Sequence, residues 1–256
     1  GFDLEKPPLW HARLFRLSPE EHVFCFNLHH ILADGWSLGI LVKDLTLAYG
    51  AAMDASESFP TPNPSEVNYL DYIAWRNQQD SGREVAYWKS ALAGMDPLLE
   101  FPTNFPRPAE QQFEGEKLSF TFDSPDTEAL RSVARQQDVT MFMTLLTAFY
   151  VLLYRYTGCC DLAIGSPVAN RPRSEFEGIF GLFANTVVLR TDLSGNPTLA
   201  TILARVRNRS LEAYEHQEAP FEEVLESLQI PRSRAHSPLF QILFTLQNAP
   251  LQVVEI

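Results

Sequence analysis

The chain starts with two apolar, β-prone segments and then adopts a helical spacing of hydrophobic residues. Residues 9–17 and 22–28 are rich in aromatic and aliphatic side chains, and Ser18-Pro19-Glu20-Glu21 between them has proline at the second position of a turn. This pattern predicts a β-hairpin. Residues 37–48 then carry apolar side chains three or four positions apart, and Gly50 after them predicts the end of a helix. The buried face of this helix would consist of Leu38, Leu41, Leu45 and Ala48.

Later segments show both spacings in a mixed order. Residues 118–122 alternate as a half-buried strand does, Thr140 suits the cap of a long buried helix ending at Gly158, and Pro220 suits the start of another helix. We predict helices at 69–79, 84–92, 127–137, 140–158, 199–214 and 221–228, and strands at 118–122, 162–168, 185–193 and 239–246. Because there is no strict βαβ repeat, this order favours an α+β fold, a two-lobed sandwich, over a doubly wound sheet.

Two proline-containing stretches mark predicted connections. Residues 54–65 are rich in serine and proline and predict an exposed loop. Residues 95–110 contain four prolines, and such a segment suits a semi-rigid connection between lobes better than a helix or a strand. We therefore predict two lobes, residues 1–105 and residues 106–256.

The composition limits the classes of partner. The 256 residues are 45% hydrophobic, enough for a substantial core, and 32 acidic against 20 basic residues give a net charge of −12. No block of basic residues interleaved with aromatics occurs, so nucleic acid and anionic membranes are disfavoured as partners. The longest uncharged apolar stretch, residues 139–154, is shorter than the roughly 20 residues that cross a bilayer and predicts a buried core helix.

The cysteine content indicates the redox compartment. Cys25, Cys159 and Cys160 are odd in number, and the first residues lack the charged and hydrophobic regions of a signal peptide. A secreted disulfide framework is therefore disfavoured, and we expect the protein in a reducing cytoplasm.

Polar residues follow the second predicted strand directly. His29 and His30 come at its end, and Asp34 and Gly35 follow across a short loop. Because successive strand residues point to opposite faces, one histidine is expected to be structural and the other free. Asp34 would either orient an imidazole or hold the loop by pairing with a cation, and Gly35 would let a ligand or another backbone segment approach closely.

Structural and metal-binding roles for this cluster compete with a catalytic one. A lone histidine is more often a hydrogen-bonded core residue than a catalyst. Zinc would need a compact third ligand beside His30 and Asp34, and the remaining histidines are scattered along the chain, so no metal is expected. Neither the G-x-S-x-G turn of serine hydrolases nor a glycine-rich phosphate loop occurs.

Residues 29–35, His-His-Ile-Leu-Ala-Asp-Gly, belong to a recognisable motif. They match the HHxxxDG motif of the condensation domains of nonribosomal peptide synthetases, within the chloramphenicol-acetyltransferase-like superfamily. Further segments resemble other motifs of that family in the family's order: residues 69–75 (YxDYxxW), 164–171 (IGxPxxxR) followed by Gly178 and Gly181, 216–222 (HQDxPFE), and 238–241. The chain departs from the final motif at Ser233, where aspartate is usual, and at Ser237, where asparagine is common.

The resemblance implies a fold and an extent. It implies a two-lobed αβ sandwich of the chloramphenicol-acetyltransferase-like type. Two earlier family motifs, including an arginine thought to pair with the motif aspartate, have no counterpart in this sequence, and family members continue beyond residues 247–250. We therefore expect an internal fragment that lacks both ends and has an incomplete N-lobe.

The resemblance also implies an activity. A condensation domain forms an amide bond when the amine of an aminoacyl group on one carrier protein attacks the thioester of an acyl or peptidyl group on another. The implied partners are donor and acceptor carrier domains and an adjacent adenylation domain, and no cofactor is bound directly, because the substrates arrive on phosphopantetheine arms. The domain is expected to be an acyltransferase in secondary metabolite biosynthesis, and activity is expected of the complete domain rather than of the fragment alone.

The resemblance assigns roles to individual residues. His30 would contact the reacting amine, either as a general base or as a positioning group. Asp34 would hold the loop by a salt bridge, and His29 would be a hydrogen-bonded core residue. Gly35 would line the channel of the phosphopantetheine arm and offer its N–H to an oxyanion.

Four further residues match family positions. Trp88 corresponds to a family tryptophan, although an aromatic at helical spacing is more often a core residue. Arg171 and Arg232 correspond to motif arginines, with plain surface solvation as the alternative for each. Trp36 follows the motif, and the continuation Asp34-Gly-Trp-Ser-Leu38 is typical of condensation domains rather than epimerization domains.

Rival functions are an epimerization domain, another HHxxxDG acyltransferase, or a degenerate domain that only docks a partner enzyme. Cyclizing relatives replace both histidines with aspartate, and plant acyltransferases carry a DFGWG motif, and neither feature occurs here. The presence of His30 and Asp34 favours an enzyme over a docking domain.

Overall fold

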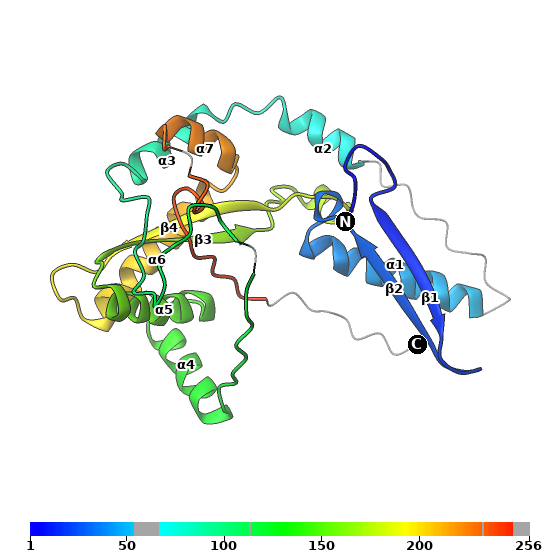
Figure 1. The fold of residues 1–256 in the computed structure, drawn as a ribbon, viewed down its shortest axis with the longest axis horizontal. Coiled ribbons are helices and arrows are strands. Elements are labelled where there is room, and N and C mark those ends of the chain that lie inside the picture. The colour runs from blue at the N-terminus through cyan, green and yellow to red at the C-terminus, as the bar shows by residue number, and fades with distance from the viewer. Residues whose placement is uncertain (54–66, 113, 232, 248–256) are drawn as a thin grey trace. The chain divides into compact units, whose positions relative to one another are not determined.

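The computed structural model of the chain describes residues 1–53, 67–112, 114–231 and 233–247 (Figure 1). The described residues divide into a first unit of residues 1–53, 67–79, 169–184 and 247, and a second unit made of the rest. Each unit has its own cluster of buried hydrophobic residues. Helices and strands occur in both units, and the fold is of the predicted α+β class.

The first unit begins with the predicted hairpin. Strand β1 (Trp10–Arg16) pairs antiparallel with β2 (His22–Leu28), from Trp10 opposite Leu28 to Arg16 opposite His22. After β2 come a short 3₁₀ helix, η1 (His30–Leu32), and then helices α1 (Gly35–Met53) and α2 (Tyr69–Arg76). A second 3₁₀ helix, η2 (Ser174–Phe176), lies in the later segment, residues 169–184.

The core of the first unit is small and aromatic. Tyr72 of α2 packs with three residues of the later segment, Phe176, Ile179 and Phe183. The rings of Tyr72 and Phe183 are 4.2 Å apart between centroids, and those of Tyr72 and Phe176 are 5.2 Å apart. These contacts join residues about 100 positions apart in the sequence.

Helix α1 differs from its prediction in its length and in which of its residues are buried. It continues to Met53 through Gly50, because one glycine costs a helix interior only about 1 kcal/mol. The predicted buried face is not buried among the described residues: Leu38 and Leu45 are 40% and 41% exposed. The buried residues of α1 are Ser37 and Ala51.

The second unit is built around another antiparallel pair. Strand β3 (Asp161–Val168) pairs with β4 (Asn185–Asp192). The helices of this unit are α3 (Gly82–Ala91), α4 (Ser124–Gln136), α5 (Met141–Thr157), α6 (Leu199–Glu215) and α7 (Phe221–Leu228). In Figure 1, α3 lies beside α7 and α5 beside α6, and α6 also packs against β4.

Helix α5 forms as its sequence predicts. The Thr140 hydroxyl accepts a hydrogen bond from the Met143 N–H, and Gly158 ends the helix in the left-handed conformation with φ of 70°. Tyr150 is fully buried, and its hydroxyl donates to the Leu189 carbonyl of β4 at 2.6 Å. Among the described residues no single helix is long and apolar enough to cross a bilayer, although α4 and α5 together meet that test as a pair bent by 105°.

Two predicted strands are wrong. Residues 118–122 form no strand, and Leu118 is 88% exposed. The alternation of hydrophobic and polar residues does not specify a pairing strand, and no strand pairs with this segment in the described chain. Residues 239–246 contribute only an isolated parallel bridge from Leu243 to Gly165. Phe240 lies directly over Gly165, where a Cβ atom would be 2.4 Å from the ring.

Some helix starts also differ. Helix α4 begins at Ser124 rather than at residue 127, because the Asp123 carboxylate accepts from the Asp126 N–H at 2.9 Å and so sets the first turn. Helix α3 begins at Gly82, two residues early, and α2 ends at Arg76, three residues early. The predicted loop at 54–65 lies outside the described residues.

The predicted lobe boundary near residue 105 falls inside the second unit. Residues 80–105 group with that unit because Trp88 and Leu92 belong to its core, whereas residues 169–184 group with the first unit. The division into lobes 1–105 and 106–256 stays a prediction.

The Tyr150 hydroxyl gives a test of the second core. Tyr150→Phe removes a buried hydrogen bond and leaves the Leu189 carbonyl without that donor, so we expect a loss of about 1 to 3 kcal/mol. Hydrogen exchange of β4 peptides at increasing urea in the full-length protein would measure it. Tyr154→Phe, one turn later on the exposed side of α5, is the matched control and should stay within about 0.5 kcal/mol. Equal effects of the two substitutions would contradict this account.

Candidate active site

The end of β2 presents the two motif histidines differently. His29 continues the strand pairing, since its N–H donates to the Leu9 carbonyl at 2.9 Å. Its ring nitrogen Nδ1 accepts from the Ile31 N–H at 3.1 Å, and its ring meets the edge of Phe2. His29 is therefore hydrogen-bonded as predicted, but it is half-buried rather than part of a core.

His30 is exposed and begins η1. Its backbone carbonyl accepts from the Ala33 N–H, whereas its imidazole makes no hydrogen bond with any described residue. The backbone on both sides is held, by the His29 pairing before it and by Asp34 after it. The imidazole is thus available to a ligand while the main chain that carries it is fixed.

Asp34 is the anchor of this loop. Its Oδ1 accepts from the Ser37 N–H and the Ser37 hydroxyl, both at 2.9 Å, and so the carboxylate caps α1. Its Oδ2 accepts from the N–H groups of Phe183 and Ala184, at 3.0 and 3.2 Å. These bonds tie the motif loop to the segment 169–184.

Arg171 is the cation that pairs with Asp34. Its Nη2 lies 3.4 Å from the carboxylate, and the two side chains are only 2% and 4% exposed. Its Nη1 donates to the carbonyls of Phe176 and Ile179, and the guanidinium lies 3.8 Å from the centroid of the Phe183 ring. Arg171 is therefore a buried structural group and not a solvated surface arginine.

The surroundings of Asp34 act on its pKa in opposite directions. Burial alone would raise the pKa of this carboxyl, but hydrogen bonds from Ser37 and Phe183 and the charge of Arg171 outweigh burial and hold the pKa below its usual range. A depressed folded-state pKa means that ionised Asp34 stabilises the fold above the unfolded pKa of about 3.9. That stabilisation is lost as the pH falls through the lower folded-state pKa.

Gly35 and Trp36 start α1. The Trp36 Nε1–H donates to the Glu177 carbonyl at 2.9 Å, which adds another bond between the motif and the segment 169–184. A Cβ atom on Gly35 would meet no described atom within 4 Å. The channel-lining and oxyanion roles of Gly35 stay predictions.

Trp88 belongs to the second unit. It is 3% exposed, and its Nε1–H donates to the His216 carbonyl at 2.8 Å, so it is a core residue, the alternative favoured from its helical spacing. His216, from the HQDxPFE-like motif, is hydrogen-bonded to Glu84 and stacks on Tyr87. Arg232 lies outside the described residues.

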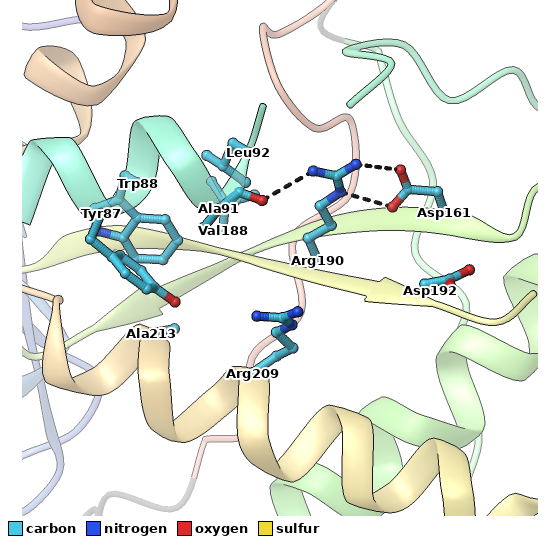
Figure 2. Close-up of a pocket in the computed structure, with 10 residues that line it drawn as sticks. All are labelled: Tyr87, Trp88, Ala91, Leu92, Asp161, Val188, Arg190, Asp192, Arg209 and Ala213. Atoms are coloured by element: carbon cyan, nitrogen blue, oxygen red, sulfur yellow. Dashed lines mark hydrogen bonds and ion pairs between the residues drawn. The ribbon is translucent and has the colours of Figure 1, made fainter. Parts of the chain in front are cut away.

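A pocket of about 400 Å³ lies in the second unit (Figure 2). Arg190 lines it, but its guanidinium already donates twice to Asp161, at 2.9 and 2.7 Å, and to the Ala91 and Ala93 carbonyls. None of the motif residues 29–35 lines this pocket. Within the described part of the chain, no group of three or more His, Cys, Asp or Glu side chains is placed to hold a metal.

The first unit thus brings together His29, His30, Asp34, Gly35, Trp36 and Arg171. Sequence reasoning missed Ser37, which is completely buried and contacts both Asp34 and Arg171. An aspartate followed three residues later by serine at the start of a helical pattern is a capping signal, and it would have pointed to this pair.

Comparisons with known proteins agree on one family. The family model for the Condensation domain matches residues 1–256. One of the linear gramicidin synthase proteins of Brevibacillus parabrevis is 45% identical over 256 residues, which cover 98% of this chain and 3% of that protein. Malpinin synthetase of Mortierella alpina is 42% identical over 252 residues, which cover 97% of this chain and 3% of that protein. The chain therefore spans only a small part of these relatives.

Solved structures show the same fold. The X-domain from teicoplanin biosynthesis has a TM-score of 0.85 and 30% identity, covering 94% of this chain and 55% of that one, and it is also known in a complex with OxyB. The four-domain nonribosomal peptide synthetase AB3403, bound to AMP and glycine, has a TM-score of 0.83 and 30% identity. This match covers 94% of the chain and 18% of AB3403.

The buried ion pair gives a test of the site. Asp34→Asn leaves the Arg171 charge buried without its partner, so we expect the first unit to lose about 3 kcal/mol or more. Hydrogen exchange of peptides covering residues 176–185 in the full-length protein would measure this loss. Asp44→Asn, on an exposed position of the same helix, is the control.

In the unsubstituted protein, the protection factors of the same peptides, corrected for the pH dependence of intrinsic exchange, should decrease as the pH falls from about 3.9, the unfolded-state pKa of an aspartate, through the lower folded-state pKa of Asp34. Unchanged protection of residues 181–184 in Asp34→Asn would contradict the anchoring role.

Proposed function

Because the chain belongs to the condensation-domain family, we propose that it forms amide bonds in nonribosomal peptide synthesis. The amine of an aminoacyl group attacks the thioester of an acyl or peptidyl group, and each substrate arrives on the phosphopantetheine arm of a carrier domain. The observation that carries the proposal is His30, an exposed imidazole without a described partner on a backbone held at both ends.

His30 is proposed to act on the attacking amine. An α-amino group has a pKa of about 7.7 to 8.0, so part of it is already neutral near pH 7, and a strong base is not required. An imidazole without an intramolecular acceptor can take up the proton after attack or hold the amine by a hydrogen bond. Positioning alone contributes on the order of 7 kcal/mol in favourable reactions.

The other site residues are proposed to support His30. Asp34 and Arg171 fix the loop and do not share the proton, because the five donors around Asp34 keep it ionised. Gly35 is proposed to leave room for the phosphopantetheine arm, since a side chain there would enter space free of described atoms. Donor and acceptor carrier domains and an adenylation domain are the proposed partners, as in a multidomain synthetase.

A second candidate is a docking domain without chemistry. The observation that favours it is the similarity to the teicoplanin X-domain, which forms a complex with OxyB. In that case the HHxxxDG motif would serve only the fold, and His30 would have no effect on a reaction.

The His30 side chain separates these two functions. In the full-length protein, His30→Ala should slow amide formation between two loaded carrier domains by roughly 10²-fold, the usual loss for a positioned acid–base group. The matched control is His22→Ala, an exposed histidine on the same hairpin, which should keep the parent rate. Single-turnover measurements would ensure that the chemical step is observed.

The pH dependence then separates the two roles of His30. A general base leaves its own inflection in the rate between pH 6 and 9, and His30→Ala removes it, whereas a positioning group leaves only the titration of the amine. A parent rate in His30→Ala would rule out the catalytic function and support docking.

A further inference from the structure

Ser37 uses the whole hydrogen-bonding capacity of its hydroxyl. The oxygen accepts from the Gly181 N–H at 3.1 Å and from Arg171 Nη2 at 3.2 Å. Its single proton is shared between two acceptors, Asp34 Oδ1 at 2.9 Å and the Gly181 carbonyl at 2.7 Å. The side chain is completely buried, so water does not replace these partners.

These four contacts join two segments that are far apart in the sequence. Ser37 lies in the first turn of α1, directly after the motif loop, and Gly181 lies 144 residues later. Both the N–H and the carbonyl of Gly181 bond to the same hydroxyl. Ser37 therefore holds the backbone of the later segment at a single point.

Gly181 is adapted to this contact. A Cβ atom there would lie 2.2 Å from the Tyr69 ring, and the Tyr69 hydroxyl donates to the neighbouring Leu182 carbonyl at 2.7 Å. Only glycine lets the backbone pass between the Tyr69 ring and the Ser37 hydroxyl. The next two N–H groups beyond Leu182, those of Phe183 and Ala184, then reach Asp34.

The carboxylate of Asp34 depends on Ser37 for its orientation. Both hydrogen bonds to Oδ1 that are shorter than 3 Å come from Ser37, one from its N–H and one from its hydroxyl. The neighbouring contact from Arg171 is longer, at 3.4 Å. Without the hydroxyl, Asp34 keeps its ion pair and its bonds to the N–H groups of Phe183 and Ala184, but it loses the bond that connects Oδ1 to Gly181.

We propose that Ser37 is a positioning residue for the reaction: its hydroxyl holds Gly181 and Asp34 together and so fixes the backbone that presents His30. This inference rests on the proposed function of His30. Ser37 does not touch the substrate. Its effect on the rate therefore has to pass through His30, and that requirement makes the inference testable.

The test is a double-mutant cycle in the full-length protein. Ser37→Ala should lower the single-turnover rate of amide formation about 10-fold or more, with little change in the carrier concentration that gives half-maximal rate. On a His30→Ala background, Ser37→Ala should have almost no further effect, because the group that it positions is absent. Thr46→Ala removes a hydroxyl from the same helix whose one bond among the described residues is to the Val42 carbonyl, and it should leave both rates unchanged.

Hydrogen exchange supplies an independent readout. Ser37→Ala should speed exchange at Gly181, whose N–H loses its acceptor, more than at Phe183 and Ala184, which keep the Asp34 carboxylate. If Ser37→Ala fails to fold, Ser37→Cys, which keeps the size and a weaker donor, is used in the same cycle and should give a smaller loss with the same non-additivity.

Three outcomes overturn the inference. An unchanged rate in Ser37→Ala shows that the hydroxyl does not position His30. An equal loss on both backgrounds shows that Ser37 only supports the amount of folded protein. A parent rate in His30→Ala itself overturns the proposed function and this inference with it, and that result is recognised without any Ser37 variant.

Discussion

The first unit depends on one buried ion pair, Asp34 with Arg171. Removing two charges from water costs several kcal/mol for each ion, and their mutual attraction offsets that cost only when hydrogen bonds satisfy the remaining donors and acceptors. Asp34 meets this condition with donors from Ser37, Phe183 and Ala184. Arg171 meets it in part, because its Nη1 donates to two backbone carbonyls whereas its buried Nε has no partner among the described residues. The segment 169–184 is thus held by polar contacts as much as by its few aromatic residues.

The described part of the first unit has little hydrophobic core besides this ion pair. The hairpin is paired along seven residues, but Leu14 and Phe24 are largely exposed, and α1 has no buried leucine. A two-stranded hairpin is only marginally stable in water by itself. The Asp34 network therefore adds to the His29 pairing the contacts that hold the loop at 29–35.

The sequence predicted the elements that rest on local rules. The caps of α5 at Thr140 and Gly158 and the pairing of β1 with β2 follow from residue types within a few positions. The failures at 118–122 and 239–246 have a common cause, since a strand is defined by a backbone neighbour that alternation does not specify. Gly50 was a poor stop signal because its cost is smaller than the gain from continuing the helix.

The site shows the same limit. The motif at 29–35 predicted a held loop and one free histidine. Local patterns could not identify the cation that pairs with Asp34, because Arg171 lies 137 residues away in the sequence. Only the resemblance of residues 164–171 to a family motif pointed to that position.

Asp34 and His30 differ in the hydrogen-bonding capacity that their environments leave available. A carboxylate surrounded by five donors has no lone pair of comparable strength left for an imidazole, so Asp34 is not available to orient His30 as in a catalytic triad. His30 must then be placed by its backbone alone. This requires a rigid main chain on both sides, which the His29 pairing with Leu9 and the Asp34 network supply. An imidazole placed in this way keeps both ring nitrogens free of bonds to the described residues, and the proposed contact with a tethered amine requires such a free nitrogen.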